Sequence, residues 1–310
     1  MLRMLVQKYS LFLSDTIFIL SIKIRITVII FVSFFPRSLY LMNQERRSFL
    51  RNTLLSTGIL LVPRSVKSLA SVTAGSIYIP GNNRELMIWH TSNLQGQLPD
   101  LLPTGNDRLL LDAGDFTGQQ TGIDMVQAMN KAGYHVANIG ASELANGQAA
   151  LAARIPDMQF ALVNCNYRFT DKMLVREVAP YKIVYIGQLK IGVTGVGPQL
   201  PADSGVTCLP PVEAASKVAA ILKKEHGCDV VICLSQTDNY KMAMDSTNIN
   251  LVVGGHQKGV LHSSLVLKNA QGHEVCLNQT NSDLNMVGNM KMMFNEEREG
   301  CGIVPGYVMA

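Results

Sequence analysis

The sequence lacks a long uninterrupted apolar run. Its most apolar stretch, residues 10–35, is broken by Asp15, Lys23 and Arg25, whereas a helix that spans a bilayer needs about 20 consecutive apolar residues. Charged residues are also scarce, at 16% of the chain against 47% hydrophobic residues. This balance excludes an intrinsically disordered chain, because enough apolar side chains are available to build a core.

Acidic residues are nearly absent from residues 1–70, where Asp15 and Glu45 stand beside ten basic residues. The rest of the chain holds 17 of the 27 basic residues and 21 of the 23 acidic ones, so its net charge is −4 although the whole chain carries +4. The basic character therefore belongs to the N-terminal segment. A nucleic-acid-binding function for the rest of the chain loses its main support.

A signal-peptide pattern occupies residues 42–70. The pair Arg46-Arg47 precedes an apolar stretch at residues 53–62, and small residues follow at 68–70. A charged region, a short apolar region and a small-residue cleavage site in this order are typical of secretory signals, and the arginine pair resembles the twin-arginine export signal. The resemblance implies export to the periplasm after folding in the cytoplasm. An ordinary basic helix start and an uncleaved membrane anchor stay open as alternatives, and the anchor would be the chain's one link to a membrane.

The signal pattern also suggests how the chain is divided. Met42 becomes a candidate start, which would make residues 1–41 an upstream extension without a fold of its own. Residues 71–310 have a length that single α/β domains commonly reach. No repeat or low-complexity tract interrupts them. We therefore expect one domain over residues 71–310.

Pairs of cysteines at CxxC spacing are also lacking, and none of the cysteines lies in residues 1–70. Several of them fall within apolar runs that read as strands, so buried free thiols are expected. One disulfide formed after export stays open as an alternative. The six cysteines are Cys165, Cys208, Cys228, Cys233, Cys276 and Cys301.

Short runs rich in Val, Ile and Leu recur through residues 71–310 and are typical of buried strands, and helical periodicity appears between several of them. After Gly259 only strand and turn patterns follow. This alternation predicts an α/β layered fold with a β-rich closing section. The expected strands are Leu86–His90, Leu109–Leu111, Val136–Ile139, Phe160–Val163, Ile183–Ile186, Ile191–Val196, Val230–Leu234, Leu251–Val253, Leu261–Leu267 and Glu274–Asn278, and the expected helices are Ile123–Ala132, Gln148–Arg154 and Pro211–His226.

Polar clusters follow several of these strands, at the edge where an open α/β sheet places its ligands. They are residues 90–96 (HTSNLQG), 112–116 (DAGDF), 140–143 (GASE), 234–236 (LSQ) and 254–258 (GGHQK). Their order and spacing resemble the calcineurin-like metallophosphoesterases, in particular the N-terminal catalytic domain of the 5′-nucleotidase group, whose motifs are HTNDLHG, DAGD, GNHE, SH and GGHTH. The resemblance covers nearly all of residues 71–310.

The resemblance implies both a fold and a site. The implied fold is a single α/β domain, a layered sandwich of two mixed β-sheets flanked by helices. In the family, carboxylates and imidazoles hold two divalent cations about 3.5–4 Å apart, which clamp a phosphate and lower the pKa of the attacking water. Hydrolysis of phosphate esters, nucleotides above all, is the activity that the resemblance implies.

Most positions of the family's site carry another residue here. Asp115 keeps the place of the carboxylate that bridges the metals, and His256 keeps that of the first histidine in the last motif. The replaced positions are Asn93 and Gln95 for an Asp and a His, Ala141 for the metal-binding Asn, Ser142 for the His that protonates the leaving group, Gln236 for the His after the fifth strand, and Lys258 for the second His of the last motif.

The remaining donors predict weak metal binding. One carboxylate, one imidazole and a few amide oxygens are a poor match for two divalent cations, and the Lys258 ammonium adds positive charge without a lone pair. We expect no cofactor, or at most one divalent metal ion held by Asp115, Asn93 and His256. We also expect Lys258 to pair with Asp115 in place of a cation. The gain of positive charge at this site favours a small anionic ligand.

Several polar residues near these motifs also have purely structural interpretations. Asp115 and His256 can serve as hydrogen-bonded turn residues. Glu143 is expected at a helix start, and His90, on a strand, as a packed core histidine.

Three classes of function follow. The first is a non-catalytic binding or partner protein on a metallophosphoesterase scaffold, since function depends on the site and not on the fold. The second is a weakly active, metal-dependent hydrolase of phosphate esters, and the third is a structural module with a filled cleft. Full-length members of the 5′-nucleotidase group carry a C-terminal domain that grips the nucleoside. Because the sequence stops at Ala310, we expect that this recognition is absent or comes from a separate chain.

Overall fold

The computed structural model describes residues 75–81, 84–102, 104–105, 108–118, 124–255, 264–280, 286–297 and 300–309. The expected extension at residues 1–41 and the signal peptide at residues 42–70 lie outside these ranges, as do His256 and Lys258. None of the helices in the described ranges has the length and apolar character that crossing a membrane requires.

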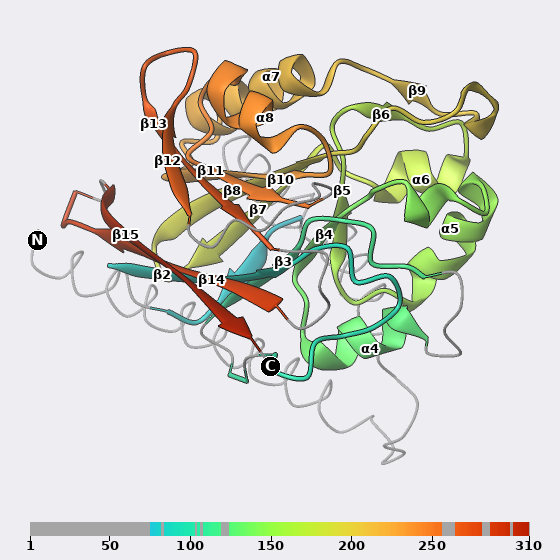
Figure 1. Ribbon diagram of the computed structural model, residues 1–310, viewed down its shortest axis with the longest axis horizontal. Helices are drawn as coiled ribbons and strands as arrows, with labels where there is room; N and C mark the ends of the chain where they lie inside the picture. Colours follow the sequence, from blue (N-terminus) through green and yellow to red (C-terminus); the bar gives the residue numbers. More distant parts are fainter. Residues whose placement is uncertain are drawn as a thin grey trace, which may run out of the picture. The chain divides into compact units, whose positions relative to one another are not determined.

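Two large β-sheets form the centre of the domain (Figure 1). The first has seven strands in the order β1-β7-β8-β10-β11-β13-β12, and the second has six in the order β15-β14-β2-β3-β4-β5. Both mix parallel and antiparallel pairs. The strands are β1 (Ile77–Ile79), β2 (Glu85–Thr91), β3 (Leu109–Asp112), β4 (Val136–Asn138), β5 (Ala161–Val163), β7 (Tyr181–Ile186), β8 (Leu189–Val196), β10 (Val230–Ser235), β11 (Leu251–Gly254), β12 (Leu265–Lys268), β13 (Glu274–Gln279), β14 (Met286–Phe294) and β15 (Gly300–Met309), and β6 (Tyr167–Arg168) pairs with β9 (Thr207–Cys208) in a small separate ribbon.

Helices cover the outer faces of the two sheets (Figure 1). One apolar cluster packs the seven-stranded sheet against α7 and α8, and another packs the six-stranded sheet against α4, α5 and α6. A third cluster, drawn from both sheets, fills the space between them. These layers confirm the predicted sandwich of two mixed sheets flanked by helices. The helices are α4 (Met125–Ala132), α5 (Gln148–Arg154), α6 (Lys172–Glu177), α7 (Pro211–Lys224) and α8 (Asn239–Asp245), with short 3₁₀ turns at η1 (Ser142–Leu144), η2 (Ile155–Asp157) and η3 (Ala202–Ser204).

The expected strands and helices are found within the described residues, with small shifts at their ends, whereas Ile123 and residues 261–263 of the strand expected at Leu261–Leu267 lie outside those residues. The helix predicted to begin at Ile123 is described from Met125, where Asp124 caps it, and α7 ends at Lys224 instead of His226. No helix occurs in the described residues after Gly259, as predicted. The structure adds elements that the sequence patterns did not predict, namely β1, the β6–β9 ribbon, α6, α8, β14 and β15.

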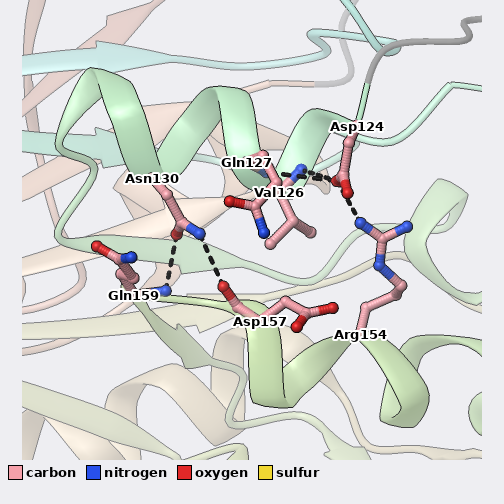
Figure 2. A network of polar contacts seen from close by, with 7 residues as sticks. All are labelled: Asp124, Val126, Gln127, Asn130, Arg154, Asp157 and Gln159. Atoms are coloured by element: carbon pink, nitrogen blue, oxygen red, sulfur yellow. Dashed lines mark hydrogen bonds and ion pairs between the residues drawn. The ribbon is translucent and has the colours of Figure 1, made fainter. Parts of the chain in front are cut away.

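A polar network holds α4 in place against the following turns (Figure 2). The Asp124 carboxylate accepts from the backbone of Val126 at 3.1 Å and also pairs with Arg154 on α5. Further along α4, the Asn130 amide donates to the carbonyl of Asp157 and accepts from the backbone of Gln159, both at 2.7 Å. These bonds fix the helix whose N-terminus follows the loop after β3.

His90, at the end of β2, is a buried core histidine, as predicted, and it joins the two sheets. Its Nε2 lies 2.8 Å from Oδ1 of Asn278 on β13. The Asn278 amide nitrogen donates to Ser264 Oγ at 2.7 Å, so its Oδ1 is the acceptor and His90 Nε2 carries the proton. The other ring nitrogen, Nδ1, is buried without a partner. Burial lowers the pKa of His90 to about 4, although the bond to Asn278 opposes the shift.

The cysteines whose side chains the structure describes are free thiols, and all but Cys208 are buried. This agrees with the expectation of buried free thiols for four of the five, whereas Cys208 is a half-buried free thiol. Burial raises the pKa of Cys165, Cys228 and Cys276 to about 11, which makes them poor nucleophiles.

Candidate functional site

The polar clusters meet at the carboxyl ends of parallel strands. In the six-stranded sheet β2, β3 and β4 run parallel, and in the other sheet β10 and β11 do. The loops after β2 and β3 are bonded to each other, since Asn93 N donates to Gly114 O at 3.0 Å and Gln95 N donates to Asp115 O at 3.1 Å. Asn93, Gln95 and Asp115, which make these bonds, have positive φ. Such strained backbone commonly marks functional loops.

Gln236, directly after β10, connects the seven-stranded sheet to these loops. The side chain is fully buried. Its Nε2 donates to the carbonyl of Gly114 at 2.7 Å and to Oδ1 of Asn93 at 3.1 Å. A neutral amide pair therefore joins Asn93 and Gln236, the two positions for which the motif resemblance leads one to expect an aspartate and a histidine. Oε1 of Gln236 is buried without a hydrogen-bond partner, which costs about 1–3 kcal/mol if nothing else binds there.

Asp115 lies against the loop that follows β4. Its Oδ1 accepts from the backbone nitrogen of Ser142 at 2.8 Å. Gly140 leaves room for this carboxylate, because a Cβ at position 140 would fall 2.3 Å from Oδ1. Asp115 is half-buried, so part of its surface is open.

Glu143 is the centre of the densest hydrogen-bond network at the site. Its carboxylate accepts from the backbone nitrogens of Asp115 at 3.0 Å, Thr117 at 2.9 Å and Gly140 at 2.8 Å. The hydroxyls of Thr117 and Ser142 donate to it as well. Burial, and then the charge of Asp115, raise the pKa of Glu143. The residue lies in the 3₁₀ turn η1, in keeping with a helix start, but its main role is to tie the loop after β3 to the loop after β4.

A second buried carboxyl group, that of Asp112, supports the loop after β3. Asp112 ends β3 and accepts from Thr91 Oγ1 at 2.6 Å and from Gly114 N at 2.8 Å. The Thr91 hydroxyl also lies 2.8 Å from the hydroxyl of Tyr134. Burial raises the pKa of Asp112 well above its usual range. Asp112 therefore shapes the turn that presents Asp115.

The structure brings together four of the expected site residues: Asn93, Asp115, Ser142 and Gln236. Gln95 and Ala141 lie on the same loops but are exposed. His256 and Lys258 fall outside the described residues, so the pairing of Lys258 with Asp115 stays a prediction.

The described donors do not fit a pair of divalent metal ions. Among the residues that the structure describes, no three His, Cys, Asp or Glu side chains lie close enough to hold a metal ion together. Asn93 Oδ1 accepts from Gln236, Ala141 offers no side-chain donor, and the Glu143 carboxylate is saturated by its own loops. Asp115 is the one described carboxylate with open surface at these loops.

Comparisons with known proteins identify the fold. No family model and no curated protein matches the sequence. Among solved structures, the chain is similar to the 5′-nucleotidase precursor of Thermus thermophilus (TM-score 0.61, 21% identity, 73% of this chain and 54% of that one). It is also similar to the NAD nucleotidase of Haemophilus influenzae (TM-score 0.60, 19% identity, 73% and 50%) and to a calcineurin-like phosphoesterase of Bacillus subtilis (TM-score 0.58, 16% identity, 73% and 91%).

The chain spans about half the length of the two nucleotidases. At these identities the likeness establishes the fold, and function has to be argued from the site. The expected motif series, the two-sheet sandwich and these three structures agree. The chain has the metallophosphoesterase fold of the 5′-nucleotidase N-terminal group.

Proposed function

We propose that this protein is a non-catalytic binding or partner protein, built on the metallophosphoesterase scaffold after loss of its two-metal hydrolytic site. The observation that carries the proposal is the amide pair of Gln236 and Asn93. These side chains bond to each other and to Gly114 O. Their bond to each other stands in a place where the family's mechanism needs anionic and imidazole ligands directed at cations.

The general acid position supports the same proposal. Ser142 stands where the family has a histidine, and its hydroxyl donates to Glu143 at 3.0 Å. A serine hydroxyl has no pKa near neutrality, so it cannot protonate a leaving group as an imidazolium does. The retained Asp115 then serves to hold the backbone of Ser142 rather than to bridge two metals.

We also propose that the protein is exported. The twin-arginine pattern at residues 42–70 carries this part, and a solved structure with a similar fold is described as a 5′-nucleotidase precursor. Periplasmic localisation is the result expected from fractionation of cells that express the full chain. The small anionic ligand expected from Lys258 stays a prediction, since that residue lies outside the described ranges.

A turnover assay tests the loss of hydrolysis. Purified protein, shown by circular dichroism to be folded, is assayed with adenosine monophosphate and bis(p-nitrophenyl) phosphate in buffer containing Mn²⁺. We expect turnover no higher than that of the Asp115→Asn variant, because the remaining side chains cannot assemble the metal pair. Manganese-dependent turnover that Asp115→Asn abolishes would establish a weakly active hydrolase instead.

A further inference from the structure

A cavity of about 630 Å³ lies at the opposite ends of the strands that carry the candidate functional site. Arg108 and His135, which line it, directly precede β3 and β4, so the cavity lies at the amino ends of these parallel strands. The loops that hold Asp115 and Ser142 follow the carboxyl ends of the same strands. Ligand cavities in proteins commonly have a volume of this order. The cavity is therefore large enough for a small organic molecule and is separate from the positions of the motif series.

Two positively charged side chains line this cavity. Arg108 is buried, and its terminal nitrogens donate to the carbonyls of Gly105 and Ala132, the latter at 3.3 Å. Because carbonyls are neutral, these bonds position the guanidinium without removing its charge. Lys131, in the last turn of α4, is exposed, and no carboxylate of the described ranges pairs with it. None of the described residues that line the cavity is acidic.

The end of α4 offsets only part of this charge. A helix C-terminus carries about half an elementary negative charge, and basic residues often lie near it for that reason. Here the last turn of α4 contains Lys131, and its last carbonyl, that of Ala132, accepts from Arg108. Two full positive charges exceed the partial charge of the helix end. The excess favours a negatively charged group in the cavity and disfavours a metal cation.

His135 adds an N–H donor to the cavity wall. Its Nδ1 accepts from the backbone nitrogen of Leu110 at 3.1 Å, so Nε2 carries the proton of the neutral ring. Burial, and also the positive charge of Arg108, lower the pKa of His135, which keeps the ring neutral at pH 7. Lys131 and His135 thus supply donors for anionic oxygens, and Arg108 supplies further charge.

Apolar side chains line the cavity as well. Tyr78 on β1 is 61% exposed, and its ring stacks on that of Tyr185, with centroids 5.0 Å apart and an interplanar angle of 7°. The stacking fixes the orientation of an exposed ring. Ile79, Pro80 and Leu102 add further apolar surface. A ligand that matches the cavity therefore has an apolar part as well as a negative charge.

We propose that this cavity binds a small organic anion that carries an apolar ring. Lys131 and His135 hold its phosphate or carboxylate group, and the charge of Arg108 strengthens that contact. The ring of the ligand lies against Tyr78 and the apolar side chains beside it. This is a second site, and it does not depend on the proposed loss of the metal pair.

Phenyl phosphate and benzoate are the probes, since each joins a ring to one of the two anionic groups. They are titrated into the purified full chain by calorimetry at low ionic strength, without added metal ion. We expect saturable binding, and the tighter probe identifies the anionic group. Lys131→Gln, which loses a charged donor, and Tyr78→Ala, which loses the ring contact, should each weaken binding about fivefold. Lys172→Gln, at an exposed lysine on α6, should leave the affinity unaltered.

Two further probes separate charge from apolar contact. Phenol has the ring without the charge, and inorganic phosphate has the charge without the ring, so both should bind at least about tenfold more weakly than the tighter anion. Equal affinity for either one would overturn the proposal, as would binding that neither Lys131→Gln nor Tyr78→Ala weakens. Absence of saturable binding of both ring-bearing anions would overturn it too, leaving Arg108 and Lys131 to stabilise the end of α4. None of these outcomes bears on the turnover assay.

Discussion

Replacing Glu143 by alanine is expected to destabilise the protein by about 3–5 kcal/mol, because it removes the shared acceptor of several buried donors. Three backbone N–H groups, those of Asp115, Thr117 and Gly140, would lose their partner together. The alanine side chain also cannot fill the space. Urea unfolding at neutral pH measures the loss.

Two further variants make this test specific. Glu143→Gln keeps one acceptor oxygen and should lose less stability than Glu143→Ala. Glu213→Ala removes an exposed carboxylate that pairs with Lys217 on α7, and it should leave the unfolding midpoint almost unchanged. If Glu143→Ala unfolds at the same urea concentration as Glu213→Ala, Glu143 does not hold the two loops together.

Acid is expected to weaken the fold through His90 by about 3 kcal/mol between pH 6.5 and pH 4. Burial lowers the pKa of this histidine to about 4 in the folded protein, from 6.5 in the unfolded chain. The folded state therefore binds fewer protons in this window, so stability is complete above pH 6.5 and falls as the pH drops. The cause is burial of the ring, and Nδ1 has no acceptor in the structure for a second proton.

His90→Gln should remove this part of the pH dependence, because glutamine does not titrate. The measurement is the difference in unfolding free energy between the two proteins at pH 7, 5.5 and 4.5. His273→Gln, at an exposed position, is the matched control and should behave like the unmodified chain. Parallel pH profiles for His90→Gln and the unmodified chain would show that His90 is not the buried, neutral group described here.

Much of the fold could be predicted because its core strands are apolar along their whole length. β10 (Val230–Ser235) is buried at every position, and a short run this rich in Val, Ile and Leu has few structural interpretations other than a buried strand. β14 and β15 gave no such signal, since β14 is rich in methionine and β15 contains several glycines and Pro305. Their pairing to β2 and to each other comes from long-range packing, which local patterns do not encode.

Short helices were missed for a different reason. α6 has six residues and α8 has seven, so each offers fewer than two turns in which to show a helical period; α5 is equally short, but it is rich in alanine, the strongest helix former. Asp171 and Asp238 cap them by accepting backbone bonds, and an aspartate before a short apolar segment was the available signal.

The site positions could be predicted from the motif series, but their interactions could not. The spacing placed Asn93, Asp115 and Gln236 at one sheet edge, because parallel strands end together. The role of Glu143 depends on donors supplied by two separate loops, and a single sequence does not show which backbone nitrogens face a side chain. The same holds for the unpartnered Oε1 of Gln236.

The metal content of the purified protein tests the central claim most directly. The full chain is expressed in medium supplemented with Mn²⁺, purified without chelators, dialysed, and measured by elemental mass spectrometry against Asp115→Asn. Loss of the two-metal site predicts well below one metal ion per chain, with no difference between the two proteins. Two metal ions per chain, reduced by Asp115→Asn, would contradict the account.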